Sequence, residues 1–234
     1  MRTLCSRVSE VCADPDEARA RIAGGEVLVD GSIVTNPGSM VATASSVTIR
    51  ERRILRGRRK LEAALKHWQI PFGDAVALDA GAAAGGFTQA LLHAGVRRVY
   101  AVEAGYGQLL GSLRQDSRVV CLERVNVGEL TTQLVPDPLD AVTLDLGYLA
   151  LALGVPQLNV LRFARRAALI ALVKPMFELG LASPPSNRDT IDEALAHAVD
   201  GIADAGWDVL DWIESPMIGS RGARELFVRA QRSE

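Results

Sequence analysis

The glycine-rich stretch LDAGAAAGGFTQALL, residues 78 to 92, has the composition and spacing of a ligand-binding turn. An apolar run ends there and helix-compatible residues follow, so Gly81, Gly85 and Gly86 are expected to form a tight connection between a strand and a helix. Such a turn brings backbone amides at a helix N-terminus close to a ligand. A dinucleotide fingerprint would need glycine in place of Ala83, and a Walker loop would need lysine directly after Gly86, so both phosphate-binding alternatives fail.

An acidic residue at the end of the next apolar run completes a different pattern. D-x-G-x-x-x-G followed by Glu103 is typical of class I methyltransferases, which bind S-adenosylmethionine (SAM). The Glu103 carboxylate could accept hydrogen bonds from both ribose hydroxyls, and the glycine loop would leave room for the methionine part. We therefore expect SAM as the cofactor, with these residues as its contacts: Asp79, Gly81, Gly85, Gly86, Phe87 and Glu103.

A second unusual stretch, RERRILRGRRK at residues 50 to 60, carries seven basic side chains in eleven positions of a chain whose net charge is -2. Such a stretch can be a solvated linker, a phosphate-binding surface or the edge of an active site. Because the overall charge gives no field that would attract nucleic acid, any such binding must come from a local patch. Arg56, Arg58 and Arg59 are the candidates for contacts to RNA phosphates.

The elements that must position these residues alternate from about residue 61 onward. Near-continuous apolar runs separated by helical sequence predict a parallel sheet covered on both faces, an α/β fold of Rossmann-like type. Two later runs would complete a seven-stranded, mostly parallel sheet. The predicted strands are 75–79, 98–103, 118–122, 140–145, 168–173, 209–213 and 225–230.

Residues 1 to 50 predict a separate small α+β module. Asp14, Pro15 and Glu17 form a helix start, and Gly24 and Gly25 end that helix. Short strands at 26–30, 33–36 and 47–49 follow. This order is similar to the small RNA-binding domain of ribosomal protein S-four, although its usual first helix is shortened here. The alternative is a packing module without a ligand. We expect domain boundaries at 1–50, a basic linker at 51–60 and a catalytic domain at 61–234.

The remaining composition excludes several classes of protein. The chain has 234 residues and 48% hydrophobic content, enough for a sizeable core. No apolar run is long enough to span a bilayer and no secretion signal is recognisable, so a cytoplasmic protein without a membrane partner is expected. Three scattered cysteines and three isolated histidines support neither a disulfide framework nor a metal site.

At the level of motifs, the sequence resembles the TlyA family, hemolysin-named ribosomal RNA 2'-O-methyltransferases with an FtsJ-like catalytic domain. The resemblance covers nearly the whole chain, and GYGQL and VKPMFE are its specific parts. The strongest matches are DAGAAAGGFT (79–88), VYAVEAGYGQL (99–109), RVVCLERVN (118–126), LVKPMFE (172–178) and ESPMIGSRGARELF (214–227). It implies a SAM-dependent enzyme whose partner is ribosomal RNA or a ribosomal subunit.

FtsJ-like enzymes use a Lys-Asp-Lys-Glu tetrad, and the matched motifs carry it over to Lys60, Asp145, Lys174 and Glu225. In this reading a lysine held by carboxylates activates a ribose hydroxyl, which is a poor nucleophile at neutral pH. The same resemblance implies that Asn126 and Asp145 contact the cofactor. An ordinary pair of salt bridges is the alternative explanation of the four residues.

Three segments near the expected acceptor pocket depart from the family pattern: Leu55 to Arg58, Asp145 to Tyr148, and ASPPSNRD at 182–189. Cofactor use should therefore transfer better than the acceptor. The alternative function is a diverged enzyme that acts on a small molecule, with Tyr148 as a pocket residue, or that uses SAM itself as the substrate by intramolecular cyclisation.

Overall fold

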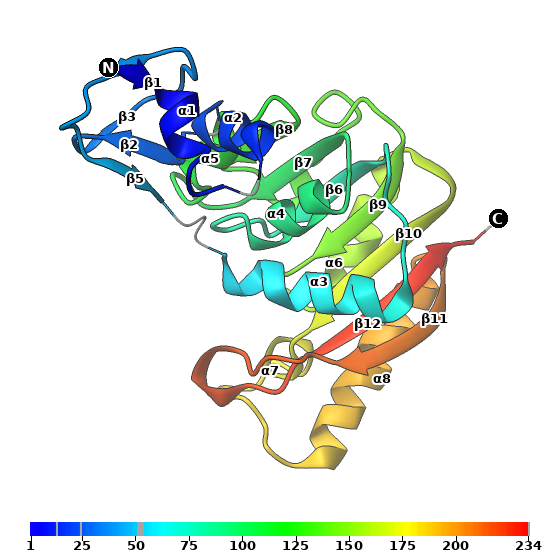
Figure 1. Ribbon diagram of the computed structural model, residues 1–234. Helices are drawn as coiled ribbons and strands as arrows, with labels where there is room; N and C mark the ends of the chain where they lie inside the picture. Colours follow the sequence, from blue (N-terminus) through cyan, green and yellow to red (C-terminus); the bar gives the residue numbers. More distant parts are fainter. Residues whose placement is uncertain (13, 24, 51–53, 234) are drawn as a thin grey trace. The chain divides into compact units, whose positions relative to one another are not determined.

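The computed structural model describes residues 1–12, 14–23, 25–50 and 54–233, and the chain divides into two compact units, Met1–Ile54 and Leu55–Glu234 (Figure 1). The first unit combines two short helices with small antiparallel sheets of order β3-β2-β5 and β1-β4. Its elements are β1 (Arg2–Thr3), α1 (Leu4–Val8), α2 (Pro15–Ala23), β2 (Val27–Val29), β3 (Ser32–Ile33), β4 (Met40–Val41) and β5 (Val47–Ile49).

The predicted helix start in this unit is confirmed. Helix α2 begins at Pro15, and the amide of Glu17 donates to Asp14 Oδ1 at 2.7 Å, which satisfies one of the free amides of the first turn. Gly25, two residues beyond the last helical residue Ala23, has a positive φ, whereas Gly24 lies outside the described residues. A small apolar core of its own joins the helices to the strands: Leu4, Val8, Ala18, Ile22, Val27 and Val41.

The second unit is built on one seven-stranded sheet of order β11-β12-β10-β9-β6-β7-β8, which confirms the predicted α/β class. Neighbours from β10 through β8 are parallel, and only β12 runs against its neighbours. The strands are β6 (Val76–Ala80), β7 (Arg98–Glu103), β8 (Val119–Glu123), β9 (Leu139–Leu144), β10 (Phe163–Val173), β11 (Trp207–Glu214) and β12 (Leu226–Arg232).

Helices cover both faces of this sheet, because alternate strand residues enter two different apolar layers. Helices α6 and α8 pack on one face, and α3 and α4 pack on the other. The helices are α3 (Arg56–Trp68), α4 (Gly86–His93), α5 (Gly111–Arg114), α6 (Leu151–Gln157), α7 (Pro175–Glu178) and α8 (Arg188–Asp204), with single 3₁₀ turns η1 (Val127–Glu129), η2 (Leu158–Val160) and η3 (Ser220–Gly222).

The basic stretch differs from the expected linker over residues 56–60. These residues form the first turns of α3, and Lys60, Leu61, Ala64, Leu65 and Trp68 make its buried face. Buried positions at this spacing lie on one side of a helix, so the segment packs on the sheet rather than connecting two domains. Residues 51–53 lie outside the described residues.

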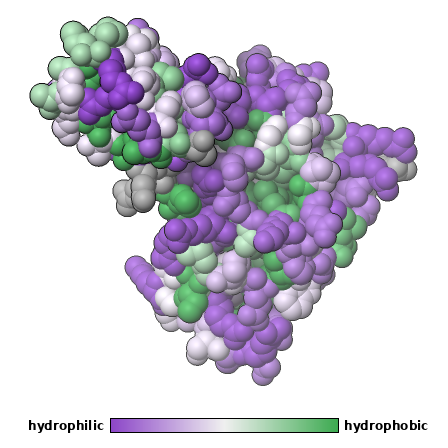
Figure 2. Space-filling model, viewed as in Figure 1, coloured by the Kyte–Doolittle hydropathy of each residue, from purple (hydrophilic) through white to green (hydrophobic). Residues whose placement is uncertain are grey.

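Polar residues cover much of the face shown in Figure 2, and apolar residues reach the surface there in smaller patches. No helix among the described residues is long and apolar enough to cross a membrane.

Candidate active site

The carboxyl edge of the large sheet collects side chains from segments far apart in the sequence. Asp145 directly follows β9, and Lys174 directly follows β10, its parallel neighbour. Because β12 is antiparallel to β10 and Val173 pairs with Leu226, the residue before β12, Glu225, comes to the same edge. Strand register alone therefore places three members of the predicted tetrad together.

Lys174 and Asp145 form an ion pair, with 2.5 Å between Nζ and Oδ1. Both side chains are mostly buried but keep some contact with solvent. A β-carbon on Gly147 would stand 3.9 Å from Nζ of Lys174, so the loop after β9 passes beside the ammonium group. This pair has the partial access that a reacting group needs.

Lys60 and Glu225 form a second ion pair, from Nζ to Oε2, between α3 and the start of β12. The two residues are only 8% and 6% exposed. Charges this deeply buried are stable only when they are paired, since removal of either partner leaves an uncompensated charge. The four residues expected to form the tetrad therefore make two lysine–carboxylate pairs in one unit.

A close contact between two glycines sets the position of the helix that carries Lys60. A β-carbon on Gly86, the first residue of α4, would stand 2.8 Å from Cα of Gly57 and 3.0 Å from the amide nitrogen of Arg58. Both of those atoms belong to the backbone of α3, so the neighbour could yield only by a shift of the helix. The absence of a side chain at Gly86 thus allows α3 and α4 to pack closely.

Gly86→Ala should therefore displace α3 and move Lys60 relative to Glu225. We expect turnover to fall by about 10²-fold, the scale of an ångström-sized misplacement, and stability to fall by about 1–3 kcal/mol from overpacking. Gly111→Ala is the matched control, because a β-carbon there meets nothing within 4 Å. Equal kinetics and equal melting temperatures for the two variants would contradict this account.

The glycine loop packs tightly against its own unit. Gly81 has φ of +84° and leaves no room for a side chain, since a β-carbon would stand 2.6 Å from the carbonyl oxygen of Asp145. Gly85 has φ of +95°, and a β-carbon there would overlap Leu113. These glycines allow the turn and the close approach of neighbouring elements.

Glu103 lies against this loop. Its Oε2 accepts a hydrogen bond from the amide of Ala83 at 2.9 Å, and its Oε1 accepts one from the amide of Gly105 at 2.7 Å. The acid at the end of β7 and the loop after β6 therefore form one polar rim next to Asp145. A carboxylate beside an amide-rich turn fits the ribose and amino-acid ends of SAM.

Asp79 was expected to contact the cofactor, but its side chain points into the core. Its side chain is completely buried and accepts hydrogen bonds from Thr88 Oγ1 at 2.6 Å and Thr143 Oγ1 at 3.0 Å. Burial raises the pKa of this carboxyl from 3.8 to about 6, against the hydrogen bonds from the two threonines, which lower it. Asp79 therefore ties the glycine loop helix to β6 and β9 from beneath.

The raised pKa of Asp79 predicts a specific pH dependence. Because the folded state binds this proton more tightly than the unfolded state, stability falls as pH rises from about 4 to 6, by up to about 3 kcal/mol, and then levels off. Asp79→Asn cannot titrate, so its stability relative to wild type should rise across that window. Urea unfolding at several pH values measures this difference, and a constant difference from pH 4 to 7 would refute the assignment.

Two further expected cofactor contacts serve local structure. Phe87 is 3% exposed and stacks on Phe227 at a centroid distance of 5.9 Å, which joins α4 to β12. Asn126 caps the 3₁₀ turn η1, and its backbone N–H donates to Glu129 Oε2 at 2.8 Å. Neither arrangement would be visible in a motif, because both depend on neighbours from the fold.

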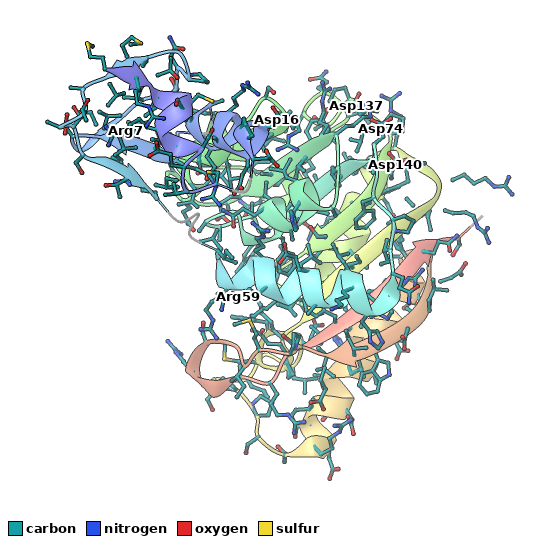
Figure 3. The ribbon with its side chains drawn as sticks, in the orientation of Figure 1. Arg7, Asp16, Arg59, Asp74, Asp137 and Asp140 are labelled. Carbon is teal, nitrogen blue, oxygen red and sulfur yellow. The ribbon has the colours of Figure 1, made fainter. Side chains whose placement is uncertain are left out.

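The three arginines predicted to contact RNA differ in the bonds that their side chains already make within the protein. Arg56 donates to the carbonyl of Ile218 at 2.5 Å, and Arg58 pairs with Glu62 one turn along α3 at 2.7 Å. Arg59 is exposed in the first turns of α3 (Figure 3). Tyr148, in the loop after Asp145, is half exposed.

Four polar residues at the carboxyl edge were not predicted as site residues. Glu123 receives the amides of the loop after β7, from Gly107, Gln108 and Leu109. In the same region the guanidinium of Arg124 lies 4.2 Å from the ring centroid of Tyr106, beside a cavity of about 410 Å³. Glu178, the fourth, is buried and ends α7, four residues after Lys174. All four lie within the motifs that resemble the TlyA family, and this position in the sequence is the signal that could have identified them.

Acidic residues at the opposite edge take no part in this site. Asp74 precedes β6, and Asp137 and Asp140 lie at the start of β9; Figure 3 shows the three near one another. Asp137 binds Arg98 and Tyr100, and Asp140 accepts the amide of Val76. Among the residues that the structure describes, no cluster of histidine, cysteine or carboxylate side chains could hold a metal ion.

The seven-stranded sheet, the glycine loop and the acid at the end of β7 define a SAM-dependent methyltransferase of class I. Residues 54–232 match the profile of the FtsJ-like methyltransferases, and the chain belongs to that family.

The comparisons also identify relatives over almost the full chain. The 16S/23S rRNA (cytidine-2'-O)-methyltransferase TlyA of Mycobacterium tuberculosis is 37% identical over 221 residues, which is 91% of this chain and 82% of that protein. Hemolysin A of Brachyspira hyodysenteriae is 29% identical over 88% of this chain and 89% of that protein. A solved hemolysin structure from Streptococcus thermophilus superposes with a TM-score of 0.74 at 25% identity, covering all of this chain and 89% of that one. The resemblance to the TlyA family is thereby confirmed.

Proposed function

We propose that this methyltransferase transfers the methyl group of SAM to a ribose 2'-hydroxyl of ribosomal RNA. The observation that carries the proposal is the set of two lysine–carboxylate pairs, Lys174 with Asp145 and Lys60 with Glu225, next to the glycine loop. The 37% identity to an rRNA 2'-O-methyltransferase supports ribosomal RNA as the acceptor. A ribosomal substrate would place the protein in the cytoplasm.

SAM supplies an activated methyl group, so the protein's main task is to activate the hydroxyl oxygen. That hydroxyl loses its proton as the oxygen bonds to carbon. In the proposed mechanism, the methyl carbon would leave the sulfur of SAM as the ribose oxygen bonds to it, with S-adenosylhomocysteine as the leaving group. The hydroxyl proton would pass to Lys174 in its neutral amine form, and Asp145 would hold the ammonium group that results. Lys60 and Glu225, which are less accessible, join α3 to the start of β12 beside Lys174.

We propose that Glu103, together with the backbone around Gly81, binds the ribose and amino-acid ends of the cofactor. Asp79 and Phe87 then support this region from the core rather than by direct contact. We also propose that Asn126 contacts the adenine end of the cofactor, because it follows β8 at the same edge of the sheet.

A local basic patch at the start of α3 supports a nucleic-acid acceptor. We propose that Arg56 and Arg59 bind RNA phosphates, with Arg58 already largely engaged by Glu62. Exposed Tyr106 and its stacked Arg124 offer the aromatic and guanidinium planes on which unpaired bases stack in RNA recognition. Tyr148 provides a further partly exposed ring beside Asp145.

Arg59→Ala should weaken RNA binding and reduce the slope of log affinity against log salt by about one, the contribution of one phosphate contact. Arg58→Ala should change both quantities less, because its guanidinium is 2.7 Å from Glu62. Arg118→Ala is the control, since that side chain is bound by Asp116 through two nitrogens. Fluorescence anisotropy over a salt series measures the slopes, and identical slopes for all four proteins would remove Arg59 from the proposal.

We also propose that residues 1–50 form an S-four-like RNA-binding module, in a shortened form that contributes little affinity. The segment contains five arginines against six carboxylates. Arg2, Arg19 and Arg21 pair with acids of the same unit, and Arg7 donates to backbone carbonyls. A surface with this balance lacks the excess positive charge on which RNA affinity usually depends.

The decisive experiment combines purified protein and methyl-labelled SAM with ribosomal subunits that lack 2'-O-methylation, and with no acceptor in a parallel reaction. The proposal expects label in rRNA that survives digestion as a 2'-O-methyl nucleoside. Separate 30S and 50S reactions identify the subunit. Label only in a small molecule, or methylthioadenosine released without an acceptor, would instead support the diverged enzyme considered from the sequence.

A further inference from the structure

We propose that Glu178 is a positioning residue for methyl transfer: it caps helix α6 from a neighbouring element and so fixes the loop that carries Asp145 relative to Lys174. The inference rests on the proposed function, because it concerns the same lysine–aspartate pair.

The carboxylate of Glu178 acts as a helix cap supplied by a different segment. Glu178 ends α7, four residues after Lys174, and its side chain is 2% exposed. Its Oε1 accepts the backbone N–H of Leu151, the first residue of α6, at 2.6 Å. The residue at the N-cap position, Ala150, has no side-chain acceptor, so this buried amide depends on Glu178 for its hydrogen bond.

The capped turn of α6 is packed against the loop that starts at Asp145. Leu146 is 3% exposed, and a β-carbon on Gly154 of α6 would stand 2.8 Å from its Cδ1. At the other end of this loop, the amide of Asp145 donates to the carbonyl of Ala80 at 2.9 Å. A shift in the first turn of α6 would therefore pass through Leu146 to Asp145, its immediate neighbour.

The second oxygen of Glu178 has a weaker partner. His197 on α8 places Nδ1 3.3 Å from Oε2, but the histidine side chain is 48% exposed. A contact that solvent can replace contributes little. Helix α8 also holds α6 independently, because a β-carbon on Gly201 would stand 2.3 Å from Cα of Ala152. Because Ala152 lies in the first turn of α6, this contact limits any shift there. Loss of Glu178 should thus free the amide of Leu151 and chiefly loosen the loop of residues 145–150 that precedes it.

Four variants test this geometry. Glu178→Ala removes the acceptor, Glu178→Gln keeps an acceptor oxygen without the charge, and His197→Ala removes only the second partner. In the double variant Glu178→Ala/Ala150→Ser, a local hydroxyl at the N-cap position replaces the missing cap. If Glu178→Ala does not fold, Glu178→Met fills the site without an acceptor and takes its place.

We expect Glu178→Ala to lower kcat on rRNA by about 10- to 100-fold, with the Kd for SAM unchanged by calorimetry. Glu178→Gln and His197→Ala should stay within a few fold of wild type, and Ala150→Ser should restore part of the loss. A purely structural role predicts instead a lower melting temperature with wild-type kcat at 25 °C, and that result would overturn the proposal.

Hydrogen exchange separates this inference from the proposed function. Peptides covering residues 145–152 should exchange faster in Glu178→Ala than in wild type, and more slowly again in the double variant. This readout needs no acceptor, so it reports on the cap even if rRNA receives no label. Unchanged exchange in this segment would show that Glu178 does not hold it.

Discussion

Replacing Lys174 with alanine is expected to reduce rRNA methylation by about 10²- to 10⁴-fold, the usual contribution of a positioned acid–base group. SAM affinity should stay close to wild type, because Lys174 is bound to Asp145 at the carboxyl end of β10 rather than to the loop between Gly81 and Gly86. Single-turnover rates with labelled SAM and calorimetric binding separate these two effects.

Lys66→Ala is the matched control for that change, since Lys66 lies on the exposed side of α3. It removes a lysine from the same unit without touching the ion pairs, and its turnover should be normal. A Lys174→Ala enzyme that keeps wild-type turnover would show that the Lys174–Asp145 pair is an ordinary salt bridge.

Substitutions of the buried pair Lys60–Glu225 should also have large effects, and they should change stability and activity differently. Glu225→Leu alone leaves the Lys60 charge without a partner and should cost about 3–5 kcal/mol in the free energy of unfolding. The double variant Lys60→Met/Glu225→Leu replaces the pair with apolar side chains and should recover most of that loss. Activity should be lost in both, because neither retains the charged groups.

Urea unfolding and turnover assays on the same preparations test this prediction. If the double variant is stable and fully active, the pair serves only the fold, and the tetrad is reduced to its Lys174–Asp145 half. If the single variant loses no stability, Lys60 is not buried as the geometry requires.

Much of this fold could be predicted from the sequence, because the strands are short apolar runs bounded by polar turns. The run at 98–103 matches β7 to the residue. Strand β10 extends five residues further toward the N-terminus than expected, across Arg165 and Arg166. A register shift between Phe163 and Ala168 accommodates this charged stretch, and nothing in a local pattern announces such a bulge.

The residues of the candidate site could be predicted from the sequence, but their partners and directions could not. Lys60 and Glu225 are 165 positions apart, so their pairing follows from strand order and the packing of α3, and only the family resemblance indicated it. The motif around Asp79 gave no sign that its carboxylate points into the core, because motif letters carry no direction. The helix beginning at Arg56 could have been recognised, since buried positions recur along α3 from Lys60 to Trp68 at helical spacing.

The place of β12 in the sheet has a consequence for how this enzyme comes into being. Strand β12 lies between β10 and β11, both of which precede it in the chain, and Glu225 arrives with it. The polypeptide must therefore be synthesised past residue 232 before this strand can enter the gap between its neighbours. A nascent chain that ends before Glu225 has its glycine loop and three of the four tetrad residues but no complete catalytic centre, so biosynthesis itself delays activity until the last strand has been inserted.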